Sequence, residues 1–174
     1  MAIENVISKT TTSHAEAYTG DYEGVTGTGA EIYDGDGTTG YKMTWYHGAD
    51  GSCAAGLTST HTWTSPITIL KIKWTTYWNA IVGNYPSASY NFSIQVQSGG
   101  SWTTVDSHSG SYNGGVGATL NEEVNGEWTN VTGVQIVFTA SAYSYEGDRW
   151  QRIYGYIYQL EAFKTIIRSF AGVV

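Results

Sequence analysis

The sequence predicts an all-β fold, an antiparallel jelly-roll β-sandwich, and three observations predict it. Thr (23 residues), Tyr (14) and Trp (7) are abundant while Leu is scarce (4), which favours pleated, half-buried surfaces over helices. Several runs alternate apolar and polar residues with a period of two, and turn-rich segments separate them. A length of 174 residues is that of about one domain.

The clearest strand is predicted over 90–96. Tyr90, Phe92, Ile94 and Val96 alternate there with polar residues, as in a strand with one buried and one wet face. Residues 98–101 then place two glycines between β-prone runs, which predicts a tight hairpin.

Further strands are predicted over 67–74, 134–139 and 153–163. In the first of these, Ile72 and Trp74 share a face with Leu70, and lysines occupy the opposite face. The run 153–163 has apolar residues in both registers, which predicts a central strand covered on both sides. The turn-rich segments are predicted at 20–40, 80–89, 107–118 and 141–148.

Residues 1–29 are predicted to pack on the sandwich as an N-terminal segment, residues 30–163 to form it, and residues 164–174 to be an apolar tail. Chain ends are ordinarily solvated, so this apolar tail is expected to be buried. It packs either as a last strand on its own domain or as a strand added to a neighbouring subunit.

The charge pattern excludes two partner classes. Lys and Arg (8) against Asp and Glu (15) give a net charge of −7, with no basic stripe for phosphates. Nucleic acid and anionic membranes are therefore not expected as partners. The opening residues carry no basic start followed by an apolar stretch, and no run of about 18 apolar residues occurs, so neither a secretion leader nor a membrane-inserted segment is expected.

No catalytic or zinc pattern emerges, and the chain is predicted not to be an enzyme. The four histidines never fall into a two-ligand spacing, and the single Cys53 offers no partner. Adjacent residues of a strand point to opposite faces, so Asp106-Ser107-His108 is not expected to form a triad. For the same reason Glu122 and Glu123 are expected to diverge, whereas a retaining glycosidase needs facing carboxyls about 5 Å apart.

Three segments, in order, resemble discoidin-type (coagulation-factor C-type) and related galactose-binding-like carbohydrate-binding domains. EIYDGDGTTGY at 31–41, followed by Trp45, resembles the family's opening. YNFSIQVQSGGSWTTV at 90–105 resembles the central hairpin, and RIYGYIYQLEAF at 152–163 resembles the closing strand. The resemblance covers about residues 30–163 and implies a jelly-roll sandwich.

The resemblance also implies one structural calcium ion in the Asp-Gly loop. The matching ligand positions are Asp34, Asp36 and Thr39. Gln159 stands where the family has its first closing acid, which leaves Glu161 as the acid on the final strand. Hard oxygen ligands on a flexible loop suit calcium. The alternative is an Asp-Gly turn without metal, whose side chains cap local amides.

Aromatic and amide residues in three loops predict a sugar site. Rings stack on the apolar face of a sugar, while planar polar groups bind its hydroxyls. The resemblance implies a ligand held in loops at one end of the sandwich. The predicted ligand-binding residues are His47, Trp78, Asn79, Tyr85, Tyr143, Tyr145 and Arg149. The alternative for the tryptophans, Trp78 included, is a place in the core.

Two functions stay open at this stage. The favoured one is a non-catalytic structural or attachment protein, a decoration or fibre component of a virion surface, because a single low-charge domain carries an apolar tail that self-association would bury. Its partners would be other copies of itself in a homo-oligomer, virion proteins or a glycan. The alternative is a free-standing extracellular carbohydrate-binding module, a lectin.

Overall fold

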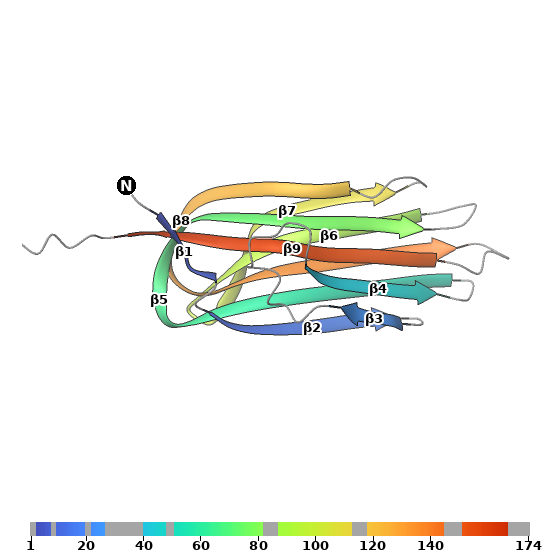
Figure 1. Cartoon of the computed structure of the whole chain (residues 1–174), viewed down its shortest axis with the longest axis horizontal. Helices are drawn as coiled ribbons and strands as arrows, with labels where there is room; N and C mark the ends of the chain where they lie inside the picture. The colour runs from blue at the N-terminus through green and yellow to red at the C-terminus, as the bar shows by residue number, and fades with distance from the viewer. Residues whose placement is uncertain are drawn as a thin grey trace, which may run out of the picture.

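The computed structural model describes residues 3–7, 10–19, 22–26, 40–47, 51–81, 87–112, 118–144 and 151–166, which form an antiparallel β-sandwich (Figure 1). The predicted all-β class and sandwich architecture are confirmed. The described strands are β1 (Ile3–Asn5), β2 (Thr11–Thr19), β3 (Tyr22–Thr26), β4 (Tyr41–His47), β5 (Gly51–Ile81), β6 (Ser87–Ser98), β7 (Ser101–Tyr112), β8 (Ala118–Ser144) and β9 (Gln151–Thr165).

Two long strands, β5 and β8, belong to both layers of the sandwich. The first part of β5, residues 51–62, pairs with β2 and with residues 133–144 of β8. The last part of β5, residues 71–81, pairs with β9, and its residues 71–78 also pair with residues 118–125 of β8. Figure 1 shows both strands curving at the left-hand end. The β9 layer therefore contains β1, β3, β4, β9 and one part of β5 and β8. The β6 layer contains β2, β6, β7, the first part of β5 and the second part of β8.

The core lies between these layers and takes alternate side chains from both. Trp74 and Trp78 of the β9 layer face Phe92 and Phe138 of the β6 layer, with ring centroids 6.0 Å apart for Trp74 and Phe92 and 6.4 Å apart for Trp78 and Phe138. All four side chains are at most 2% exposed. The alternation predicted for the strand over 90–96 is confirmed.

The Gly-Gly hairpin between β6 and β7 is also confirmed. Gly99 and Gly100 have φ angles of 59° and 82°, the left-handed backbone that a type I′ turn requires at both central positions. The strand over 153–163 is central as predicted, because β9 pairs with β4 on one side and β5 on the other.

The predicted turn-rich segments are wrong in their bounds. The predicted turn segment 20–40 contains β3, and the segment 80–89 contains the end of β5 and the start of β6 at Ser87. β7 continues into the segment 107–118 as far as Tyr112, and β8 continues into the segment 141–148 as far as Ser144. These stretches are rich in Ser and Gly, which have weak strand propensity. Each lies in or beside an established ladder, and pairing with its neighbours overrides that preference.

The N-terminal segment contributes strands to the sandwich. β1 pairs with β9, β2 with β5 and β3 with β4. At the other end, Ile166 is 38% exposed, and residues 167–174, on which the predicted burial of the tail depends, lie outside the described residues. Within the described ranges no helix is long and apolar enough to span a membrane.

A buried histidine connects the N-terminal segment to β5. His61 Nδ1 lies 3.2 Å from Thr10 Oγ1 and 3.3 Å from Thr12 Oγ1, and His61 Nε2 lies 3.0 Å from Ser59 Oγ. The Thr10 hydroxyl donates to the Ile7 carbonyl at 2.6 Å, so its oxygen accepts from Nδ1–H. This pattern assigns the neutral Nδ1–H tautomer, with Ser59 donating to Nε2.

Candidate functional site: a groove beside the loop end

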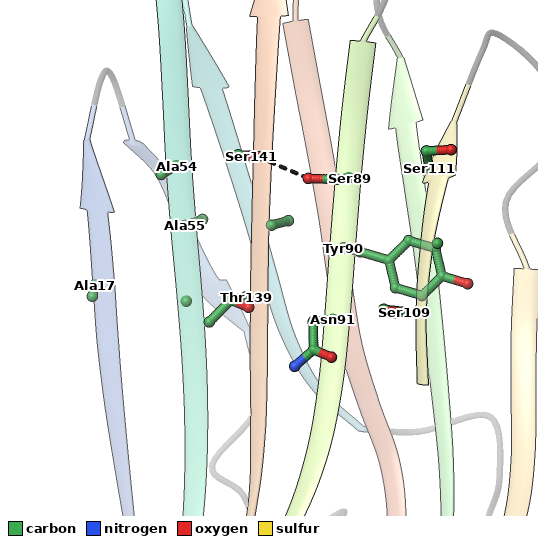
Figure 2. A pocket seen from close by; sticks show the side chains of 13 residues that line it. Ala17, Ala54, Ala55, Ser89, Tyr90, Asn91, Ser109, Ser111, Thr139 and Ser141 are labelled. Atoms are coloured by element: carbon green, nitrogen blue, oxygen red, sulfur yellow. Dashed lines mark hydrogen bonds between the residues drawn. The ribbon is translucent and has the colours of Figure 1, made fainter. Parts of the chain in front are cut away.

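A groove of about 870 Å³ hollows the outer surface of the β6 layer (Figure 2). All five strands of the layer line it. Two neighbouring rows of short side chains make the hollow: Ala17, Gly56, Thr139, Asn91 and Ser109 in one, and Ala54, Ser141, Ser89 and Ser111 in the other. Because none of these side chains is larger than Asn, the surface is lower here than in rows that carry longer groups.

A belt of longer side chains crosses the same face nearer the bend of the sandwich. Thr60 donates to Gln135 Oε1 at 3.1 Å, Gln135 donates its amide N–H to Gln95, and Gln95 donates to Thr104 Oγ1 at 3.3 Å. These hydrogen bonds connect four strands in one direction. The belt therefore fixes the long polar side chains on the bend side of the groove.

The groove is uncharged, and its mostly apolar surface carries several hydroxyls and one amide. The hydroxyls of Ser89 and Ser141 hydrogen-bond to each other at 2.9 Å, and Figure 2 shows the Asn91 amide and the Thr139 hydroxyl nearby. None of its described lining residues carries a charge. Hydroxyls and amides exchange hydrogen bonds with a hydroxyl-rich neutral ligand, and alanine methyls contact its apolar parts. The described lining therefore offers an ionised ligand no opposite charge.

The groove lies next to the end of the sandwich at which the sequence predicted a ligand. β8 continues from Ser141 to Tyr143, whose backbone pairs with Ser52 and Ser87. β4 ends at His47, and the strand ends that adjoin segments 82–86 and 145–150 lie at this same end. The side chains of His47 and Tyr143 lie outside the described part of the structure, as do the complete residues Tyr85, Tyr145 and Arg149.

Two predicted ligand residues lie away from the groove. Trp78 is 2% exposed and packs against Tyr90 in the core with ring centroids 4.8 Å apart, as the core interpretation has it. Asn79 alternates with it on the outer side of the β9 layer and pairs with Tyr154. The Oδ1 of Asn79 is buried, with no hydrogen-bond partner among the described residues.

Of the four predicted calcium ligands, the structure describes Glu161 alone. Its Oε1 accepts a hydrogen bond from Asn5 Nδ2 at 3.2 Å, across the junction of β1 and β9. Asp34, Asp36 and Thr39 lie outside the described residues. In the part of the chain that the structure describes, no group of three or more His, Cys, Asp or Glu side chains is arranged to hold a metal ion. The calcium site stays a prediction.

Calcium is expected to raise the midpoint of thermal unfolding if the Asp-Gly loop binds it. At a free concentration ten times the Kd, binding to the folded state adds about 1.4 kcal/mol. Asp34→Asn is expected to abolish the shift, whereas the exposed Glu127→Gln keeps it. Calorimetry with calcium and with a chelator measures both, and equal midpoints for the unsubstituted protein would contradict the prediction.

The patterns that imitate catalytic groups are arranged as the sequence predicts. Glu122 lies 3.8 Å from His108 Nδ1, whereas Glu123 lies 2.8 Å from Lys71 Nζ on the outer side of the β9 layer. The two carboxylates therefore diverge. The Asp106 carboxylate accepts a hydrogen bond from the indole N–H of the buried Trp74 at 3.2 Å, and this bond connects the two layers.

Comparison with solved structures gives similar folds. The chain is similar to chitosan-binding module 1 derived from a chitosanase/glucanase of Paenibacillus sp. IK-5, with 20% identity, 91% of this chain and 98% of that chain covered, and a TM-score of 0.44. It is similar to the F5/8 type C domain of a Bacteroides fragilis protein, with 15% identity, 89% and 93% covered, and a TM-score of 0.33.

A third similar structure is GH31 CBM32-2 bound to GalNAc, with 14% identity, 88% of this chain and 99% of that chain covered, and a TM-score of 0.39. No protein-family model matches the chain, and no curated protein sequence matches it. These similarities agree with the predicted resemblance to discoidin-type, galactose-binding-like domains at the level of a β-sandwich alone. Function has to be argued from this chain's own residues.

Sequence reasoning missed the groove because its residues look like turn residues. Ser109, Ser111 and Ser141 fall in segments predicted as turns, yet all three lie in strands. The available signal was the alternation of Ser89 and Asn91 with larger side chains. Small residues on one strand form a hollow only when the neighbouring strands carry small residues at the paired positions. The sequence of a single strand does not show which residues it pairs with.

Proposed function

We propose that this chain is a non-catalytic glycan-binding domain whose ligand occupies the groove of the β6 layer and extends toward the adjoining loop end. The observation that supports this function is an uncharged groove across five strands, whose mostly apolar surface also carries hydroxyls and one amide. Neutral sugars present many hydroxyls and small apolar faces, and this lining offers partners for both.

The position of the groove supports the same function. It lies at the end of the sandwich where β4 and β8 bring the backbones of His47 and Tyr143. A groove of short side chains holds part of a glycan, and ring and amide side chains from the loops would add stacking and hydrogen bonds at one end of it.

The finer roles stay predictions. A virion decoration or attachment protein and a free-standing lectin both use a glycan site, and the described residues favour neither. Homo-oligomerisation and a location on a virion or outside the cell depend on features beyond the described groove. Glycan binding is the common part, and it is tested first.

Filling the groove is expected to weaken glycan binding at least tenfold. Ser141→Trp places an indole across the second row of the groove, at an exposed strand position that tolerates a large β-prone residue. The matched control is Ser13→Trp, exposed on β2 of the same layer but outside the groove. A glycan array with and without calcium selects the ligand, and calorimetric titration then measures the Kd of each variant.

Two outcomes would contradict the proposal. An array without signal in the presence of calcium would remove the function. Equal affinities of Ser141→Trp and the unsubstituted protein would remove the groove as its site.

A further inference from the structure

Four tyrosines lie together on the outer surface of the β9 layer, on the opposite side of the sandwich from the groove. Tyr77 of β5 is the register partner of Tyr156 of β9, and their rings are stacked with centroids 5.3 Å apart and planes 29° apart. Tyr154 and Tyr158 meet the Tyr156 ring edge-on at 6.2 and 5.8 Å. All four are half-buried. These four residues are called the tyrosine platform.

The third strand, β4, adds a cation to the platform. Lys42 pairs with Tyr156, and its Nζ lies 5.4 Å from the ring centroid of Tyr156 and 5.9 Å from that of Tyr158. Attraction between the ammonium and the ring faces helps to hold both rings in place. Burial raises the pKa of Tyr158, and the nearby Tyr77 raises it further, so the Tyr158 hydroxyl stays a hydrogen-bond donor at neutral pH.

A polar pocket of about 340 Å³ adjoins the platform. Its floor is Thr75, whose hydroxyl donates to Asn121 Oδ1 at 2.9 Å and whose register partner on β9 is Gln159. Thr75 is two residues from Tyr77, and Gln159 directly follows Tyr158. The pocket and the platform therefore form one continuous surface along β5 and β9.

Three carboxylates and one ammonium group line this pocket, and lysines neutralise one of the carboxylates, Glu123. Lys73 is the register partner of Glu123 on one side and of Glu161 on the other, and its Nζ lies 3.3 Å from Glu123. Lys71 also pairs with Glu123, at 2.8 Å. These contacts hold the pKa of Glu123 well below its usual value, at about 2, so the carboxylate accepts hydrogen bonds at all ordinary pH values.

The tyrosine platform and its pocket together have the chemistry of a carbohydrate-binding surface. They place aromatic rings beside amides, a hydroxyl and carboxylates that are held in position. Ring faces cover the C–H faces of sugars, and planar amides and carboxylates bind pairs of hydroxyls. A protein partner would favour a more apolar and less charged centre. Because the platform and the pocket follow one another along two strands, the surface suits consecutive sugar rings of a linear chain.

We propose that the tyrosine platform and its polar pocket form a second saccharide-binding site, which takes a linear neutral oligosaccharide along β5 and β9. The inference goes beyond the groove and does not require it. With one site on each side of the sandwich, a single copy of the chain would bind two glycan strands at once and cross-link a polysaccharide.

The test separates stacking from simple burial at Tyr156. Tyr156→Leu keeps an apolar side chain but lacks a planar ring, whereas Tyr156→Phe keeps the ring. Both are titrated with hexasaccharides of β-1,4-linked glucose and of β-1,4-linked galactose. Ser141→Trp is the groove variant, and denaturation midpoints check that each variant is folded. In protein carrying ¹³C-labelled tyrosine, the ring signals of the platform report contact directly.

We expect Tyr156→Leu to weaken binding at one of two sites about tenfold while Tyr156→Phe keeps it, and the labelled platform signals to shift with ligand. Unchanged platform signals in the presence of a bound hexasaccharide would overturn the second site, and the groove would stand if Ser141→Trp alone loses binding. If Tyr156→Leu loses hexasaccharide binding and Ser141→Trp keeps it, the platform is supported as a site and the groove is overturned. A self-associated protein that dissociates on Tyr156→Leu would show the platform to be a subunit contact and overturn the proposal.

Discussion

Lowering the pH from 7 to 5 is expected to reduce the free energy of unfolding by about 2 kcal/mol through His61 alone, and the loss to reach about 3 kcal/mol at pH 4. Burial, and to a smaller extent the charge of neighbouring His14, lowers the pKa of His61 from 6.5 to about 4. Between these two values the unfolded chain binds a proton that the folded chain does not. Stability is therefore complete above pH 6.5 and falls as the pH approaches 4.

Burial of the His61 ring is the main reason why the folded state resists that proton. Nδ1–H donates to the Thr10 hydroxyl oxygen, and Nε2 accepts from Ser59. A proton on Nε2 would turn this acceptor into a donor, so the Ser59 hydroxyl would have to rotate and accept from it, inside a site with no exposed surface. The charge would also be buried with its desolvation penalty.

Two variants separate this effect from the titration of other groups. His61→Gln carries an amide that donates and accepts without titrating, so its stability is expected to change less between pH 7 and 5. His108→Gln, on a half-exposed ring, is expected to keep the full loss. Denaturant unfolding at pH 7, 6 and 5 measures all three proteins. Equal pH dependence in His61→Gln and the unsubstituted chain would rule out this role of His61.

The sequence was informative about the fold where period-two alternation was strong. The strand over 90–96 and the Gly99-Gly100 hairpin follow from local patterns, since side-chain period and positive φ are properties of a few adjacent residues. The bounds of β7 and β8 did not follow, because pairing with neighbouring strands extends them through Ser- and Gly-rich stretches. The joining of two layers by single strands, β5 and β8, is likewise a property of the long-range register.

The candidate sites were less predictable for the same reason. The sequence placed ligand residues in loops, and the structure brings the backbones of His47 and Tyr143 to one end of the sandwich. The groove and the tyrosine platform, by contrast, each depend on side chains from three to five strands. The tyrosines of β9 were interpreted as one face of a strand buried on both sides, whereas their rings are half-buried and continue onto β4 and β5.

Adding one methyl group at Gly155 is expected to destabilise the fold by about 1–3 kcal/mol, and Gly155→Val by more. A Cβ at Gly155 would collide with Cε1 and Cδ1 of Phe138, far inside van der Waals contact. Phe138 is fully buried and its ring lies 4.7 Å from that of Phe92, so it has no space into which to move. The absent side chain of Gly155 is therefore what lets the two layers approach.

A size exchange between the two positions tests this explanation. Phe138→Leu removes the Cε1 and Cζ atoms that collide and by itself leaves a cavity, so it is destabilising when Gly155 is present. In the double variant Gly155→Ala with Phe138→Leu the new methyl occupies part of that space. We expect the pair to be less destabilised than the sum of the single variants by about 0.5–3 kcal/mol.

Gly56→Ala is the matched control, because its Cβ would meet the Phe138 carbonyl oxygen at 3.4 Å and Ala17 Cβ at 3.9 Å, both ordinary contacts. It is expected to be neutral or to stabilise by up to about 1 kcal/mol, since alanine restricts the unfolded chain. Guanidinium unfolding of the five variants measures these energies. Two results would contradict this explanation: changes in the free energy of unfolding that add exactly in the double variant, or a Gly155→Ala protein as stable as Gly56→Ala. Either result would mean that contact between the Phe138 ring and Gly155 does not set the distance between the layers.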